Sequence, residues 1–153
     1  MTINLEKHIT SDQPDISWRF DDKKEVLRKI RVLDKETENL IWGKLKGDIL
    51  IQDNELRSDK FDKFESIEFR DNYDTVTIRL KELLKNTSAT DKVVLTWFSD
   101  GHSFVTDFET FIANWEDFFY PSSDDLVVVN ENWDWIIHIA HFESFQLGLG
   151  IKD

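Results

Sequence analysis

The chain has 153 residues, of which 31 are Asp or Glu and 19 are Lys or Arg, so its formal net charge is −12 at pH 7. It has no cysteine, which excludes a disulfide framework, cysteine-based zinc sites, thiol catalysis and iron–sulfur ligation. Its 12 Phe and 6 Trp exclude a disordered acidic chain. The length predicts one domain, 1–153, that buries about two-thirds of the unfolded surface.

The first half of the chain gives a mixed pattern. Residues 1–15 predict an irregular lead-in that ends near Pro14, and Ile16–Phe20 predicts a short strand. Residues 26–46 fit either a helix or a hairpin. We favour the hairpin, because the polar residues 34–39 separate two apolar runs and Gly43 weakens a helix.

Three further elements are expected before residue 92. Ile49–Ile51 would continue the meander, and the apolar residues Phe64, Ile67 and Phe69 suggest another strand. Thr75–Lys85 begins like a strand and ends with the spacing of a helix.

The second half gives clearer signals. Val93–Phe98 predicts a strand, Ser99–His102 a hairpin turn around Asp-Gly, and Ser103–Val105 the returning strand. Thr106 and Glu109 form a capping-box pattern. The helix that follows carries one apolar stripe and stops before Pro121; its members are Phe108, Phe111, Ile112, Trp115, Phe118 and Phe119.

Three strands should complete the chain, at Leu126–Val129, Trp133–Ile139 and Glu143–Leu149. Helices and strands do not alternate regularly. The sequence therefore predicts an α+β fold, with an antiparallel sheet and one or two helices packed on one face.

Charge is unevenly distributed along the chain. Residues 1–92 hold 20 acidic and 18 basic side chains, whereas residues 93–153 hold 11 acidic side chains and one basic one, Lys152. These acids either keep an aromatic-rich segment soluble or form a surface that attracts a cationic partner. The charge argues against direct binding of nucleic acid or anionic membrane. Met1–Thr10 lacks the apolar run of a signal peptide, so a cytoplasmic protein is expected.

The histidines near the end of the chain are the first candidates for chemistry. His138, His141 and Glu143 would bind a metal if they lay on one helix face. On a strand the two imidazoles point to opposite faces, unless a turn near His141 brings them together. A structural His138 is the favoured interpretation, and no metal or cofactor is expected.

Other catalytic patterns are weaker. Ser99, Asp100 and His102 are too close in a tight turn to form a nucleophile and its base. Asp15, followed by Asp22-Lys23-Lys24, resembles a metal-dependent nuclease pattern, with which a charge of −12 fits poorly. No glycine spacing matches a phosphate-binding loop.

The Trp133-Asp134-Trp135 strand is the main candidate for recognition. Strand alternation places Trp133 and Trp135 on one side, either packed under the helix or exposed as an aromatic platform. Asp125, Glu131 and Asp134 would then share an edge with Tyr120. Acids around an aromatic anchor are typical of an interface that captures Arg or Lys.

The segment 93–149 resembles a known family in its order of elements. A Trp-bearing strand is followed by an aromatic helix that ends in 115–125 (WEDFFYPSSDD), and then by a Trp-x-Trp strand that ends in His. This order looks like that of the small acidic α+β immunity proteins that accompany bacterial polymorphic or contact-dependent toxins. The resemblance implies a non-catalytic inhibitor of one cognate toxin and transfers no individual functional residue.

The sequence thus favours a non-enzymatic acidic protein that neutralises a basic protein partner. Its alternatives are a hydrolase that uses His138 or His141 with a carboxylate, and a nucleic-acid mimic that blocks a DNA-binding protein. The oligomeric state is open, although Glu143–Leu149 would pair with a second copy if it were an edge strand. The expected partner-binding residues are Glu116, Asp117, Tyr120, Asp124, Asp125, Glu131 and Asp134.

Overall fold

A computed structural model describes residues 4–97, 103–121 and 124–152. The predicted turn Ser99–His102 lies outside these residues, as does any site built on it. The elements in chain order are η1 (Leu5–His8), η2 (Ser17–Phe20), α1 (Lys24–Leu27), β1 (Arg31–Val32), α2 (Lys35–Gly47), β2 (Ile51–Gln52), β3 (Glu55–Leu56), η3 (Ser58–Lys60), β4 (Phe61–Glu68), α3 (Asp74–Leu84), β5 (Lys92–Trp97), β6 (Ser103–Asp107), α4 (Phe108–Asn114), η4 (Trp115–Asp117), β7 (Leu126–Asn130), β8 (Trp135–Ala140) and β9 (Ser144–Ile151).

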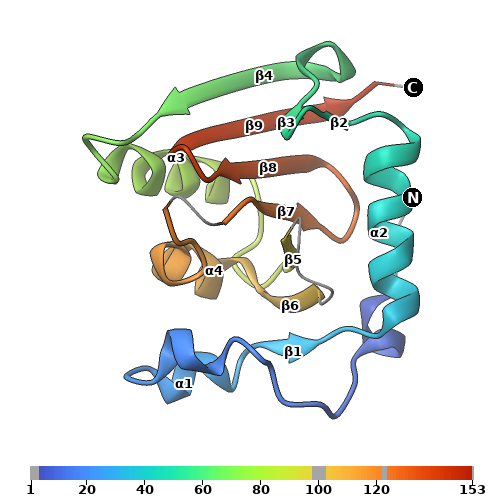
Figure 1. The fold of residues 1–153 in the computed structure, drawn as a ribbon, viewed down its shortest axis with the longest axis vertical. Helices are drawn as coiled ribbons and strands as arrows, with labels where there is room; N and C mark the ends of the chain where they lie inside the picture. Colours follow the sequence, from blue (N-terminus) through green and yellow to red (C-terminus); the bar gives the residue numbers. More distant parts are fainter. Residues whose placement is uncertain (1–3, 98–102, 122–123, 153) are drawn as a thin grey trace.

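A seven-stranded sheet forms the centre of the fold. Its order is β1-β6-β5-β7-β8-β9-β4, and every neighbouring pair is antiparallel (Figure 1). A separate hairpin pairs β2 with β3. The predicted strands of the second half are confirmed, and so is the strand around Phe64 and Ile67.

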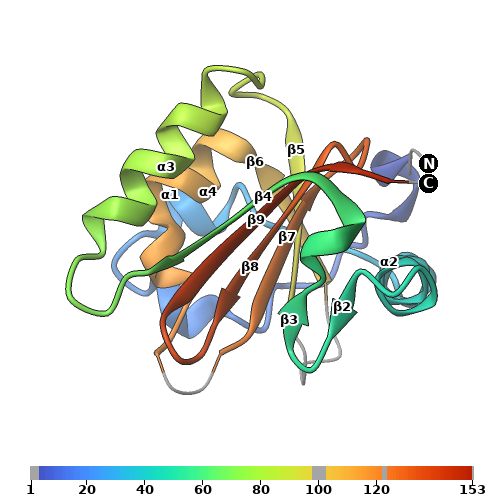
Figure 2. The same cartoon turned by 90° about the horizontal axis from the view of Figure 1, so that it is seen from above.

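Helices α1, α3 and α4 cover one face of the sheet, so the predicted α+β fold with an antiparallel sheet is confirmed (Figure 2). The opposite face carries a second, smaller core, under α2 and the β2–β3 hairpin. Ile41 and Leu45 of α2 are fully buried there. Both faces of the sheet are therefore covered, which explains why the residues of β7 and β8 are all buried.

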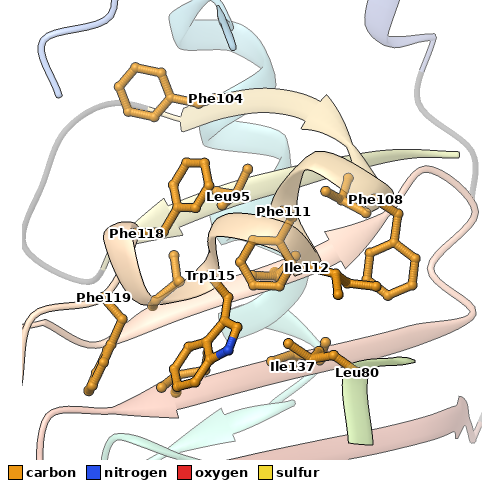
Figure 3. Packing of buried hydrophobic residues seen from close by; sticks show 14 of the residues in the cluster. Leu80, Leu95, Phe104, Phe108, Phe111, Ile112, Trp115, Phe118, Phe119 and Ile137 are labelled. Atoms are coloured by element: carbon orange, nitrogen blue, oxygen red, sulfur yellow. The ribbon is translucent and has the colours of Figure 1, made fainter. Parts of the chain in front are cut away.

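The aromatic helix packs as its periodicity predicts. All six residues of the apolar stripe are buried, and Figure 3 shows them together with Leu95 and Ile137 of the sheet. Its start is corrected by one residue: the Asp107 carboxylate, and not Thr106, accepts the Thr110 N–H at 2.7 Å. The reason is that pairing between β5 and β6 continues to Asp107. The helix also tightens into the 3₁₀ turn η4 before Pro121.

Two predictions for the first half are wrong. Ser17–Phe20 is a 3₁₀ helix and not a strand. The favoured hairpin in residues 26–46 is replaced by α2, because the Asp34 carboxylate caps the helix by accepting the Thr37 N–H and hydroxyl at 2.8 Å. The polar residues 35–39, interpreted as a turn, are the first turn of this helix. The helical end predicted for Thr75–Lys85 is confirmed, and its strand-like start is corrected, because α3 begins at Asp74.

Trp133 and Trp135 lie on opposite faces, which corrects the predicted shared face. Trp133 precedes β8 with φ of 59°, so the alternation of a strand begins only after it. Its ring packs in the core under α2, with the Lys44 ammonium 5.4 Å from the ring centre. Trp135 packs against Phe108 with ring centres 5.0 Å apart. Both indoles are core residues.

Candidate functional site

Strand β7 divides the predicted binding residues into two groups. Tyr120 and Asp125 precede this strand, whereas Glu131 and Asp134 follow it. Five residues at about 3.3 Å each place the two groups roughly 16 Å apart. The shared edge predicted for these four residues is therefore not formed. Asp134 instead accepts a hydrogen bond from the Asn130 side chain at 2.8 Å.

Tyr120 belongs to an exposed aromatic patch, which we define as Trp18, Arg19 and Tyr120. Trp18 is 52% exposed and Tyr120 is 43% exposed. Their rings meet edge to face, with centres 5.2 Å apart. Segments about 100 residues apart in sequence, η2 and the turn after η4, thus build one surface feature.

The Arg19 guanidinium holds this patch together. Its carbon lies 4.8 Å from the ring centres of both Trp18 and Tyr120, and 5.3 Å from that of Trp97. These are cation–π distances. The side chain of Arg19 is only 8% exposed, so its guanidinium lies beneath the two rings and their outer surfaces remain in contact with solvent.

Asp124 completes the cage around Arg19. Its Oδ2 lies 2.8 Å from Arg19 Nη1 and accepts the Tyr120 N–H at 2.8 Å. The sequence predicted acids around an aromatic anchor that capture a cation, and in the fold the captured cation is the chain's own Arg19. Asp124 therefore positions Tyr120 and is not itself free for a partner.

Glu116 and Asp117 lie on η4, beside a polar groove of about 550 Å³ between α3 and α4. Asp117 forms an ion pair with Lys23 at 2.6 Å, and Lys23 also donates to the Asn114 side chain. Lys23 is thereby directed toward η4, which argues against the nuclease-like interpretation of the Asp22-Lys23-Lys24 pattern. Glu116 remains exposed at the rim.

Asp125 joins the two histidines. It lies 3.0 Å from His141 Nδ1 and accepts the His141 N–H at 3.1 Å, and its Oδ1 is 3.9 Å from His138 Nε2. Strand β8 ends at Ala140, so the turn brings His141 toward His138. His138 itself is fully buried beside Gln146, and this burial lowers the pKa of its imidazole. A buried, neutral His138 fits a structural role.

The metal site considered for His138, His141 and Glu143, which the sequence disfavours, does not have ligand spacing among the described residues. Glu143 accepts the Tyr73 hydroxyl at 2.6 Å, and burial together with this carboxylate raises the pKa of Tyr73 to about 12. In the described ranges, the one group with metal-ligand spacing is His8, Asp34 and Glu36. Asp34 is already engaged by the α2 cap and by His8 at 2.9 Å.

Sequence reasoning missed Trp18 and Arg19. They stand in a segment predicted as a strand, and their partners are remote, since Arg19 and Asp124 are 105 residues apart. The available signal was the aromatic–cation dipeptide Trp18-Arg19 itself.

Among the described residues, no helix is long and apolar enough to cross a membrane. Comparison with known proteins found no matching family model and no similar curated protein.

Proposed function

We propose that this protein is a non-catalytic binding protein that neutralises a basic protein partner, with the aromatic patch as its anchor. The observation that carries the proposal is the exposed pair Trp18 and Tyr120, held rigidly by the buried Arg19. Large exposed aromatics in contact are uncommon without a partner, and Trp, Tyr and Arg dominate binding hot spots.

Rigidity is what makes this patch suited to binding. An aromatic side chain that is fixed before association loses little conformational entropy when a partner covers it. The Arg19–Asp124 ion pair and the Tyr120 N–H bond to Asp124 fix Tyr120 in this way. The anchor is thus preorganised by contacts within the chain.

Exposed carboxylates near the patch supply the attraction for a basic partner. Asp21 and Asp22 follow directly after η2, and Glu116 lies on η4 four residues before Tyr120. The net charge of −12 adds a long-range field. Such a field accelerates association with a cationic protein and is screened by salt.

The toxin-inhibitor interpretation follows from this chemistry and from the resemblance of residues 93–149. A basic toxin would be attracted by the acidic protein and would then bind the preorganised aromatic patch. The mimicry of nucleic acid needs a regular double row of free carboxylates. It has less support, because Asp117 and Asp124 are paired with Lys23 and Arg19.

The hydrolase alternative has one observation in its favour, the approach of Asp125 to both His138 and His141. A base for hydrolysis must be accessible; His138 is completely buried, which leaves the 43% exposed His141 as the base that this alternative would use.

The test is affinity capture with three baits: the wild-type chain, Trp18→Ala and Ile78→Ala. Ile78 is a matched control, because it is 58% exposed on α3, a helix that contributes no residue to the patch. We expect one basic protein to bind the wild type and the Ile78 variant and to be lost with Trp18→Ala. Its association rate should fall steeply between about 0.05 and 0.5 M salt. Retention by all three baits, or a rate independent of salt, would refute the proposal.

A further inference from the structure

The two edges of the main sheet are protected differently. The edge at β1 is short and is covered by the lead-in, where Ile9 bridges to Leu33 and the Thr10 N–H donates to the Val32 carbonyl at 2.8 Å. The predicted edge strand at Glu143–Leu149 is an interior strand, since β9 lies between β8 and β4. The remaining edge is β4.

Strand β4 is eight residues long and, in the part of the chain that is described, pairs with β9 alone (Figure 1). Its other side presents a row of backbone N–H and C=O groups along the upper border of the sheet. Asp62, Lys63, Ser66 and Glu68 are exposed on it. Long open edges are templates for another strand, and charged side chains on them oppose pairing unless the incoming strand carries the opposite charges.

We propose that β4 pairs antiparallel with β4 of a second copy, about a two-fold axis at Phe64. The two seven-stranded sheets would then form one continuous sheet. A two-fold axis requires a self-complementary edge, in which residue i faces residue j and j faces i. The sequence of β4 meets this requirement in one register.

Charge complementarity selects that register. With Phe64 opposite its own copy, Lys63 faces Glu65 of the second copy, which also pairs with Arg79 of its own chain, and Lys60, the last residue of η3, faces its Glu68. Each pair occurs twice by symmetry, and no two like charges from residues 60–68 stand opposite each other. Opposite charges directly across an antiparallel pair stabilise it, whereas like charges destabilise it.

The central contact is apolar. Phe64 is half-buried and stacks on Phe61 with ring centres 6.5 Å apart, so a second Phe64 across the axis would cover its remaining surface. The net charge of the chain opposes association only weakly, because charges beyond about 8 Å are screened at physiological salt. Such a dimer does not cover the aromatic patch, because η2 lies at the β1 end of the molecule, opposite β4 (Figure 1).

Sedimentation over a wide range of protein concentrations measures the oligomeric state. We expect a reversible shift from the mass of the monomer to twice that mass as the concentration rises. Lys63→Glu places Glu opposite Glu65 at two symmetric sites and should raise the dissociation constant about tenfold. Lys60→Glu should also weaken the dimer, and the exchange Lys60→Glu with Glu68→Lys should restore it, because the opposed charges are then merely reversed.

Cysteine cross-linking tests the register, since the chain has no cysteine of its own. Phe64→Cys places two thiols across the axis at a Cα separation of about 4.5–5.5 Å, which suits a disulfide, so oxidation should give a covalent dimer. Ser66→Cys is the control, because Ser66 faces Asp62 of the second copy and should not cross-link.

A monomer at all concentrations up to about 1 mM would overturn the proposal and leave the edge to a strand from another protein. So would a dimer unaffected by Lys63→Glu, or one that cross-links through Ser66→Cys.

Discussion

Replacement of Arg19 by Ala is the sharpest test of the aromatic patch. The substitution removes a guanidinium that contacts three aromatic rings and pairs with Asp124 at 2.8 Å. The two charged side chains are only 8% and 13% exposed, so water replaces the lost cation poorly. Asp124 is then left with the Tyr120 N–H as its remaining polar partner among these contacts.

The expected loss of stability is about 2–3 kcal/mol. Breaking a fully buried ion pair by removing one partner costs about 3–5 kcal/mol. We place the loss below that range, because Asp124 keeps one hydrogen bond and lies near the surface. For a domain of this size it corresponds to a fall of about 5–10 °C in the melting temperature.

Arg57→Ala provides the matched control. Arg57 likewise pairs with one carboxylate, that of Asp59, to which its guanidinium donates two hydrogen bonds at 3.0 and 2.7 Å. This pair is 32% and 60% exposed, and ion pairs of this kind contribute less than about 1 kcal/mol. Urea unfolding followed by tryptophan fluorescence measures both variants, since Trp18 and Trp97 flank Arg19.

A loss below about 0.5 kcal/mol in Arg19→Ala, or equal losses in the two variants, would refute the reasoning. The Arg19 cage would then be a surface contact without energetic weight, and the preorganised anchor would lose its physical basis.

Three further predictions concern the scaffold. Burial lowers the pKa of His138 below its usual 6.5, so the unfolded protein binds more protons at this residue than the folded protein does. The free energy of unfolding should therefore fall as the pH drops below about 6.5, by up to about 1.4 kcal/mol per pH unit. Urea unfolding between pH 7.5 and 5 should show a weaker dependence of this free energy on pH for His138→Gln. Asp34→Ala should cost about 1–2 kcal/mol, measured by thermal unfolding, because it removes the cap of α2. Gly148→Ala should cost about 1–3 kcal/mol by the same assay, because the added Cβ would lie 2.5 Å from the Phe61 ring. At Gly43 an added Cβ meets no atom within 4 Å, so Gly43→Ala should stabilise α2 by up to about 1 kcal/mol. An unchanged pH slope, a neutral cap removal or equal effects at the two glycines would contradict the respective prediction.

The sequence predicted the second half of the fold well because its apolar pattern is strong enough to identify each element alone. The stripe of α4 and the runs at β7 and β8 are buried throughout. In the first half, the pattern was ambiguous. The start of α2 contains Glu36 and Glu38, and these polar residues fit a turn as well as the first turn of a helix. The Asp34 carboxylate, which caps this end, stabilises the helix.

The candidate site was less predictable than the fold, because contacts between distant segments create it. Tyr120 and Asp124 were predicted, and the structure brings them together. Trp18 and Arg19 could not be assigned to them by spacing. A single residue with φ above zero, Trp133, places its own side chain and that of Trp135 on opposite faces of the sheet. Local periodicity does not encode such a reversal.

Charge gives the clearest case in which position along the chain misleads. The last 61 residues carry 11 acids and one base, but Asp117, Asp124 and Glu143 meet Lys23, Arg19 and Arg70 from the first half. An acidic half of the sequence is therefore not an acidic half of the surface. A basic partner would have to compete with these cations for the same carboxylates. Affinity should then rest on the exposed rings, and the remaining net charge should act mainly on the rate of association. Removal of Trp18 should accordingly change dissociation, and added salt should change association.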